Sequence, residues 1–423
     1  MTRFLYALAW AVAAPLAVVR LAWRSRRQRG YLGRLGERFG RYAPAPAAPR
    51  IWIHAVSVGE TRAAAPLVEA LAKRCPGHRI LLTHMTPTGR ATGEALFGDA
   101  VERAWLPYDL RFAVRRFLAH FRPELGVILE TEVWPRLLEE CRRAGVPVVL
   151  ANGRLSERSA RRYARLPSLA RWAFGSLAGV AAQTEADARR FASLGAREVA
   201  VTGNVKFDMD VPDAMRHRGR EFRARFGAAR PVWVAGSTRE GEEALLLDAF
   251  ARLQDAGDAL LVLVPRHPQR FEEVARLAAA RGFAVARRSE ESRIAAEARV
   301  LVGDSMGEML AYYEAADVVI MGGSLLAFGS QNLIEACALG RPVIVGPHTY
   351  NFEEASEGAI TAGAAIRVAD AAAALREAAR LAADPLRRRA MGEKALAFVA
   401  AHRGAVSRLL DWLEPRLPRP AGR

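Results

Sequence analysis

The chain contains few cysteines and no recognisable metal-binding pattern. Its three cysteines, Cys75, Cys141 and Cys337, are isolated and far apart, so they form neither a CxxC pair nor a disulfide framework. The sequence has no HExxH segment and no cluster of histidine with cysteine. We therefore expect buried thiols, a reducing compartment and no bound metal or other cofactor.

Motifs of several other protein classes are also missing. We do not expect a serine hydrolase, although residues 303–307, GDSMG, match the GxSxG spacing. There is no zinc-finger spacing, RNP-like aromatic motif or basic-region heptad, so we do not expect nucleic acid as a partner. The excess of 62 Lys+Arg over 45 Asp+Glu, a formal charge of +17, instead suggests anionic lipid or phosphorylated substrates.

One long apolar run is present, at the N-terminus. It covers 4–19, is interrupted only by Pro15, and is extended by 21–23 to nearly the 20 or so residues of a membrane span. A cleaved signal peptide fits poorly because an arginine cluster follows, and a buried helix fits poorly because the run is apolar on all sides. We predict a single membrane anchor with its basic flank in residues 1–29. The arginine-rich side is expected to be cytoplasmic, by the positive-inside rule.

The length of 423 residues predicts two domains. After a short helix and a Pro/Ala linker (30–49), strand and helix patterns alternate through 50–208, pause at a connection (209–230), and alternate again through 231–414. A flexible tail (415–423) follows. The expected strands are continuous apolar runs, typical of parallel sheets covered by helices on both faces. We predict an α/β protein with two Rossmann-like, doubly wound sheets and an interdomain cleft for two substrates. Single helices are expected over 156–177 and 384–413.

The segment IWIHAVSVGE, residues 51–60, predicts a strand that turns through Ser57 and Gly59 into a helix, with Glu60 at the helix start. Carboxyl edges of such sheets hold ligands. Two interpretations stay open. Glu60 either stabilises the helix N-terminus or acts chemically in the cleft.

Two carboxylates and a lysine follow other predicted strands of the first half. Glu130 and Glu132 come after the apolar run GVIL, and the pattern does not tell which of them faces the cleft or whether they cap the next helix. Lys206 follows the last strand in a chain where lysine is scarce. It is either a phosphate or carboxylate ligand or an exposed linker charge.

In the second half, four glycine-rich or cationic loops follow predicted strands. Helix-start amides can bind phosphate, and a carboxylate one turn into a helix can accept hydrogen bonds from a ribose. Four such loops in one domain indicate nucleotide binding. The predicted substrate- and nucleotide-binding residues are Ser57 and Gly59 in the first half, and Ser237, Thr238, Arg266, His267, Gly303, Ser305, Met306, Gly307, Glu308, Gly322, Gly323, Ser324, Asn332 and Glu335 in the second.

Several motifs together resemble the lipid A Kdo transferases, where Kdo is 3-deoxy-D-manno-octulosonic acid. They are HAVSVGE (54–60), ETEVWP (130–135), GNVKFD (203–208), PRHPQRF (265–271), GDSMGEM (303–309) and GGSLLAFGSQNLIEA (322–336), with GPHTYNF (346–352) after them. The turn 327–331 departs from the family pattern, so Ala327 and Phe328 are not assigned to the site.

The resemblance implies an inverting, metal-independent glycosyltransferase of the GT-B type at the cytoplasmic face of the inner membrane. Its donor would be CMP-Kdo, its acceptor lipid IVA, and Glu60 the general base. Glu130, Glu132 and Lys206 would also act in catalysis. The first alternative is another GT-B enzyme, a transferase or epimerase that uses a UDP-sugar. The second is a non-enzymatic, membrane-attached binder of polyanions.

Overall fold

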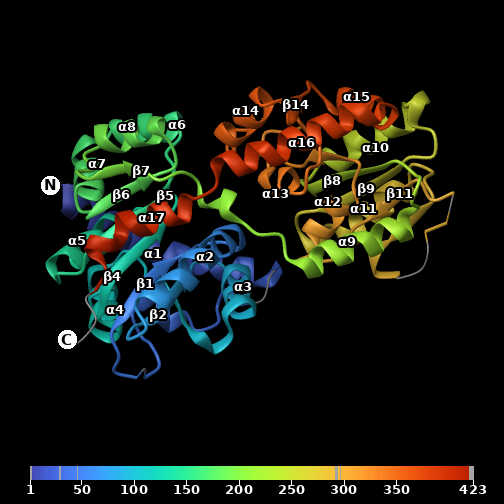
Figure 1. The fold of residues 1–423 in the computed structure, drawn as a ribbon. Helices are drawn as coiled ribbons and strands as arrows, with labels where there is room; N and C mark the ends of the chain where they lie inside the picture. The colour runs from blue at the N-terminus through green and yellow to red at the C-terminus, as the bar shows by residue number, and fades with distance from the viewer. Residues whose placement is uncertain (1, 28–29, 45, 291–293, 296, 419–423) are drawn as a thin grey trace. The chain divides into compact units, whose positions relative to one another are not determined.

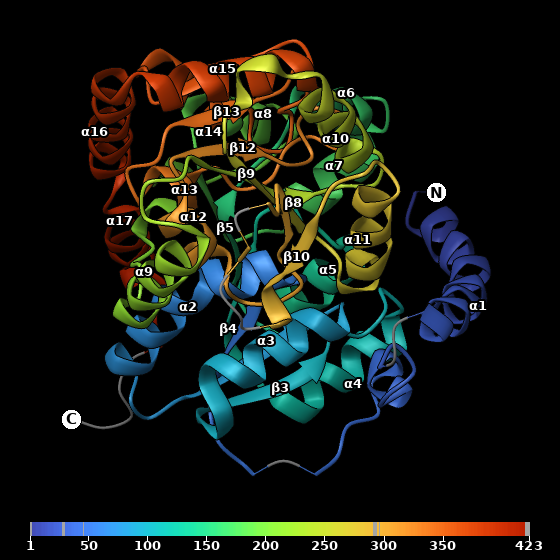
Figure 2. The same ribbon diagram turned by 90° about the vertical axis from the view of Figure 1, so that its right-hand side faces the viewer.

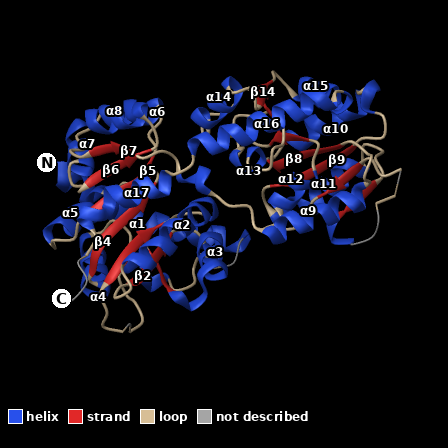
Figure 3. Cartoon of the chain, viewed as in Figure 1, coloured by secondary structure: helices blue, strands red, loops and turns tan. Residues whose placement is uncertain are grey.

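The computed structural model describes residues 2–27, 30–44, 46–290, 294–295 and 297–418. The chain divides into two compact units. The first unit combines Met1–Asp208 with Gly404–Arg423, and the second is Met209–Arg403. Each is a twisted sheet with helices on both of its faces, as Figures 1 and 3 show. The predicted α/β fold with two doubly wound sheets is therefore confirmed, and the cleft between the units stays a prediction.

The sheet of the first unit has seven parallel strands in the order β3-β2-β1-β4-β5-β6-β7. Its central strands are almost fully buried, as continuous apolar runs require when helices cover both faces. The strands are β1 (Arg50–His54), β2 (Arg79–His84), β3 (Val101–Trp105), β4 (Pro123–Leu129), β5 (Val148–Gly153), β6 (Gly179–Ala182) and β7 (Val199–Val201).

Helices connect these strands and form two buried apolar clusters against the sheet. They are α2 (Val58–Arg74), α3 (Pro87–Phe97), α4 (Arg111–Phe121), α5 (Pro135–Arg143), α6 (Glu157–Ala164), α7 (Pro167–Phe174) and α8 (Glu185–Ser193). The expected single helix over 156–177 is wrong. Pro167 begins α7, and the residue before a proline is disfavoured in helical conformation, so the chain breaks at Leu166.

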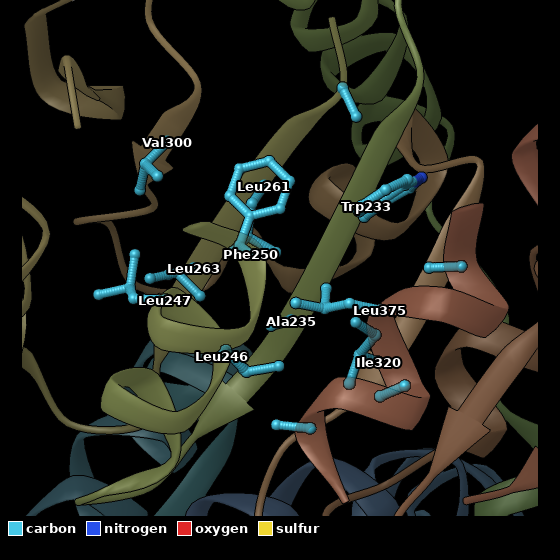
Figure 4. Close-up of a cluster of buried hydrophobic side chains, with 14 of the residues drawn as sticks. Trp233, Ala235, Leu246, Leu247, Phe250, Leu261, Leu263, Val300, Ile320 and Leu375 are labelled. Atoms are coloured by element: carbon cyan, nitrogen blue, oxygen red, sulfur yellow. The ribbon is translucent and has the colours of Figure 1, made fainter. Parts of the chain in front are cut away.

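The second unit repeats the architecture, with seven parallel strands in the order β10-β11-β9-β8-β12-β13-β14. Trp233, Phe250 and Leu261 lie in its core together with Ile320 and Leu375 (Figure 4). The strands are β8 (Val232–Thr238), β9 (Leu260–Pro265), β10 (Val285–Arg287), β11 (Val300–Val302), β12 (Val318–Met321), β13 (Val343–Val345) and β14 (Ala365–Arg367).

Helices of the second unit include the segment that the sequence suggested to be a connection between domains. That segment forms α9, which contacts α12 extensively and belongs to this unit. The helices are α9 (Asp213–Phe226), α10 (Glu242–Arg252), α11 (Phe271–Ala279), α12 (Met309–Ala315), α13 (Ile334–Cys337), α14 (Glu353–Thr361), α15 (Ala371–Ala383) and α16 (Pro385–His402).

Two predictions for the C-terminal part of the chain are wrong: the end of the second domain at residue 414 and the single helix over 384–413. α16 ends at His402, Gly404 takes a left-handed conformation with φ 88°, and α17 (Ala405–Leu413) starts in a new direction. Asp208 fixes this turn by accepting hydrogen bonds from the backbone N–H groups of Gly404 and Val406. The buried side of α17 then completes a core of the first unit (Figure 1).

Both ends of the chain contact the first unit. α1 (Thr2–Arg27) runs along its outside (Figure 2) and contacts α5 and α7. Residues 28–29 of the predicted anchor and Ala45 of the predicted linker lie outside the described residues, as does most of the predicted tail, 419–423. Arg416, within that tail, pairs with Glu198 and lies over the ring of Trp412.

Candidate functional site

The chain reverses its order across the first sheet between β1 and β4. β2 and β3 lie on one side of β1, and β4 to β7 lie on the other. Such a switch point leaves the carboxyl ends of two neighbouring strands with their loops turned apart, which is where open α/β sheets bind ligands. The segment after β1 carries Glu60, and the segment after β4 carries Glu130.

Glu60 lies in the first turn of α2 and takes part in capping that helix. The hydroxyl oxygen of Ser57, the N-cap residue, accepts a hydrogen bond from the Glu60 N–H. The Glu60 carboxylate in turn accepts hydrogen bonds from the backbone N–H of Val56, at 2.7 Å, and from the Ser57 hydroxyl, at 3.2 Å. This is a variant of the capping box. Glu60 thus stabilises the N-terminus of its own helix, and its carboxylate turns back over the helix start.

The environment of Glu60 also changes its acidity. Burial raises the pKa of Glu60 to about 8, and the neighbouring charges of Glu130 and Glu132 act in the same direction. The Val56 N–H and the Lys206 ammonium oppose this rise. A carboxylate that holds a proton near neutral pH is a common feature of acid–base sites.

Lys206 and Glu130 form an ion pair next to Glu60, with 2.6 Å between Nζ and Oε1. Both side chains are mostly buried. Glu130 and Asn152 both have left-handed backbone conformations, with φ of 59° and 54°. The Asn152 side-chain oxygen accepts a hydrogen bond from the Val205 N–H and so holds the segment that carries Lys206. Lys206 is therefore not an exposed linker charge.

Glu132 and Gly59 complete the first group of predicted residues. Burial raises the pKa of Glu132, while a hydrogen bond with Trp134 opposes the rise. Gly59 is exposed, and an added Cβ would meet nothing within 4 Å. The start of α2 is thus open beside Glu60. The structure brings Glu60, Glu130 and Lys206 together and adds the charge of Glu132 to their surroundings.

The second sheet has its own switch point, between β8 and β12. Here the loop after β12 lies directly on the end of β8. A Cβ on Gly322 would come within 2.4 Å of the Ser237 carbonyl oxygen, so only glycine allows this approach. Ser237 and Gly323 both have positive φ, 55° and 71°. The predicted loops after β8 and β12 therefore form one structure.

Glu242, which was not among the predicted site residues, holds this loop in place. The residue is fully buried at the start of α10. Its carboxylate accepts hydrogen bonds from the backbone N–H groups of Gly323 at 2.6 Å, Leu325 at 3.0 Å and Leu326 at 3.4 Å. It also accepts one from the Arg239 N–H at 2.8 Å. Burial raises the pKa of Glu242, while these donors oppose the rise.

We expect Glu242→Gln to loosen the loop between β12 and α13. One oxygen of the carboxylate becomes an NH₂ group, which faces N–H donors, and each lost buried hydrogen bond costs about 1–3 kcal/mol. The variant should unfold at lower temperature and bind the nucleotide expected from the sequence more weakly. Calorimetric unfolding and nucleotide titration measure the two effects. Glu240→Gln, at an exposed carboxylate two residues earlier, is the matched control and should leave both unchanged.

Cationic side chains gather at the ends of β8 and β9. His267 lies 3.4 Å from the Arg239 guanidinium, and the backbone N–H of Arg266 donates a hydrogen bond to the Thr238 carbonyl oxygen. Burial lowers the pKa of His267, and the nearby arginines lower it further. Arg239 also lies over the ring of Phe328, 4.7 Å from its centroid. Phe328, set aside on sequence grounds, therefore belongs to these surroundings.

The loop 303–308 is held by contacts with residues outside it. Burial would raise the pKa of Glu308, but hydrogen bonds and charge from Arg288 and the charge of Arg218 leave it below its usual value. Ser305 is hydrogen-bonded to Tyr312 at 2.8 Å, and Met306 is exposed. The carboxylate of Glu308, predicted to bind nucleotide, is thus engaged in positioning this loop.

Three further predicted residues also make internal contacts. The buried Ser324 hydroxyl donates to the Met321 carbonyl and accepts from the Gly346 N–H at 2.8 Å. The Asn332 amide donates to Glu335 at 3.2 Å, near the start of the short helix α13. Across the described part of the chain, no group of three or more His, Cys, Asp or Glu side chains is arranged to hold a metal ion.

Comparison with known proteins identifies the family. Residues 33–209 match the family model described as 3-deoxy-D-manno-octulosonic-acid transferase, and residues 243–398 match that of glycosyl transferases group 1. The chain is 49% identical to the 3-deoxy-D-manno-octulosonic acid transferase of Bordetella pertussis, over 98% of this chain and 99% of that one. The chain belongs to the 3-deoxy-D-manno-octulosonic acid transferases. The transferase of Haemophilus influenzae is 37% identical over 99% of this chain and 100% of its own length.

Solved structures share the fold of this transferase. A glycosyltransferase from Rickettsia africae is 13% identical and aligns with a TM-score of 0.59, covering 89% of this chain and 98% of its own. A UDP-GlcNAc 2-epimerase from Neisseria meningitidis is 15% identical with a TM-score of 0.57, covering 86% and 100%. The likeness confirms a GT-B-like fold. Because transferases and epimerases share it, the sequence family, and not the fold, identifies a Kdo-transferring enzyme.

Proposed function

We propose that this enzyme transfers Kdo from CMP-Kdo to the lipid A precursor lipid IVA in lipopolysaccharide biosynthesis, with inversion at the anomeric carbon and without a metal or other cofactor. Family membership supports the Kdo donor. The observation that carries the mechanism is the group at the first switch point. It combines a carboxylate with a pKa of about 8 and a lysine–glutamate pair 2.6 Å long.

In the proposed reaction, Glu60 is the general base. The oxygen of an acceptor hydroxyl attacks the anomeric carbon of Kdo, and Glu60 takes the proton of that hydroxyl. The bond between the anomeric carbon and the phosphate oxygen breaks, and its electron pair leaves with CMP. The Val56 N–H and the Ser57 hydroxyl fix the orientation of the carboxylate, and each oxygen keeps a lone pair for the incoming proton. The capping contacts are thus compatible with the catalytic role.

Charge on the donor must be balanced by the protein. We assign this to Lys206 in the first unit and to the cations at the ends of β8 and β9, with Arg266 among them, in the second. Glu130, paired with Lys206, would hold that ammonium in position between turnovers.

Membrane attachment is part of the proposal. α1 is the helix of the described chain that is long and apolar enough to cross a membrane. Its arginine-rich end and the formal charge of +17 favour anionic lipid at the cytoplasmic face of the inner membrane. A lipid acceptor would then meet the enzyme at its own surface.

Mass analysis of lipid IVA after incubation with CMP-Kdo and the purified enzyme tests donor, acceptor and number of sugars together. We expect a mass increase of one or more Kdo residues with release of CMP. Release of UDP from UDP-GlcNAc in a parallel reaction, with no Kdo added, would favour the UDP-sugar alternative. Binding of vesicles without any turnover would favour a non-enzymatic binder.

A further inference from the structure

α1 is attached to the first unit from its first turn. The Arg3 guanidinium lies 3.0 Å from the buried Glu139 carboxylate, and the Arg3 carbonyl accepts a hydrogen bond from Arg136. One turn later, the Tyr6 hydroxyl donates to Asp109 at 2.6 Å. The same Asp109 carboxylate accepts from the backbone N–H groups at the start of α5, so α1 is joined to the cap of a core helix.

The attachment continues to the far end of α1. The Trp10 ring lies 5.8 Å from Tyr108 and 5.9 Å from Trp134. Ala14 is buried, and Leu21 is buried in a cluster with Tyr108. The attached positions 3, 6, 10, 14 and 21 recur at helical spacing, so they form a single face of α1.

The opposite face of α1 is apolar and exposed. At 100° per residue, its side chains point away from the attached face. They are Phe4, Leu5, Leu8, Val12, Leu16, Val19 and Trp23, each more than half exposed. This face extends for about 28 Å at about 1.5 Å per residue. Soluble proteins rarely expose so continuous an apolar surface unless it binds something.

We propose that α1 lies in the plane of one membrane leaflet as a fixed part of the first unit, and does not cross the membrane. The exposed face from Phe4 to Trp23 enters the hydrocarbon, and Arg20, Arg24 and Arg26 near its end meet anionic headgroups. This inference rests on the proposed membrane attachment and replaces the crossing anchor by a helix in the plane of the leaflet.

Crossing is disfavoured because of what it would break. A helix perpendicular to the membrane would take Arg3 through the hydrocarbon. It would also separate Arg3 from Glu139 and Tyr6 from Asp109, and those two buried carboxylates would each lose a partner. A helix in the plane keeps these contacts and still buries the apolar face.

Labelling of an introduced cysteine distinguishes the two arrangements. Thr2→Cys is expected to react with a membrane-impermeant maleimide in inside-out vesicles and not in right-side-out vesicles. Leu386→Cys, on an exposed residue of the second unit, is the matched control and should behave identically. The three native cysteines are buried and give little background. Reaction of Thr2→Cys only in right-side-out vesicles would overturn the proposal.

Depth measurements provide the second test. Fluorophores placed by Leu5→Cys, Val12→Cys and Val19→Cys should be quenched at the same depth in vesicles of phosphatidylethanolamine and phosphatidylglycerol. A deep Val12 position between two shallow ends would show a crossing helix instead. Sedimentation of the unmodified enzyme with the same vesicles tests attachment itself. If the enzyme did not sediment with the vesicles, both arrangements of α1 would be refuted. Turnover of CMP-Kdo in the same preparation would still support the proposed activity.

Discussion

Glu60→Gln is expected to lower kcat by about 10²–10⁴-fold, which is the usual contribution of a general base. Glutamine keeps the size of the side chain. Its oxygen can accept the hydrogen bond from the Val56 N–H, and its NH₂ group can donate to the Ser57 hydroxyl oxygen, so the helix cap survives. A purely structural Glu60 would tolerate this change. Rates of CMP release and unfolding temperatures, measured on the same preparations, separate the two roles. The exposed Glu69→Gln on the same helix is the control and should be fully active.

The pH dependence sharpens this test. Because Glu60 must be deprotonated to act as a base, kcat/KM should rise with pH and level off above a pKa of about 8. Stability should change in the opposite direction. A carboxyl whose pKa is raised by folding stabilises the folded state at low pH, and this contribution is lost as pH rises through the folded pKa. The unfolding temperature of Glu60→Gln should therefore improve, relative to the native enzyme, as the pH rises from about 5 to about 8. A flat rate profile in the native enzyme would contradict Glu60 as base.

Lys206→Met is expected to lower kcat/KM by at least about 10²-fold, the size seen when a preorganised charge in an active site is lost. The change removes the ammonium from Glu130, which leaves a mostly buried carboxylate without that charge. It also removes a charge that lowers the pKa of Glu60. The rise of kcat/KM with pH should consequently move to higher pH.

Glu130→Gln provides the matched comparison because Glu130 acts on Glu60 in the opposite direction. Its charge raises the pKa of Glu60, so its removal should move the rate profile to lower pH. The double variant should regain part of the stability lost in Lys206→Met, with a coupling energy of about 0.5–3 kcal/mol, but not its activity. If the two single variants shifted the profile in the same direction, the assigned electrostatics would be wrong.

The sequence was most informative about where strands end. Apolar runs without alternation marked the buried parallel strands, and the polar residues after them fell at the carboxyl edges of both sheets. This pattern predicts that Glu60, Glu130 and Lys206 lie at one edge of the first sheet. The pattern could not show that the Glu60 carboxylate caps its own helix, since a first-turn acid looks the same in both roles.

Contacts between segments distant in sequence were beyond the pattern. Glu242 looked like an ordinary acid at the start of a helix, yet it bonds a loop some 80 residues later. The signal available was the run of three glutamates in 240–243 beside a glycine, more than one helix start requires. α17 was missed because its apolar spacing continues that of α16, and only the turn at Gly404 redirects it.

The return of α17 to the first unit has a consequence for synthesis. Leu409, Leu410 and Leu413 are buried against strands and helices formed by the first 208 residues. While the second unit is being translated, the first unit has all its strands but lacks this cover, and an apolar surface stays open to solvent or to chaperones. The N-terminal unit is therefore the last to be completed, although its sheet is the first to be made.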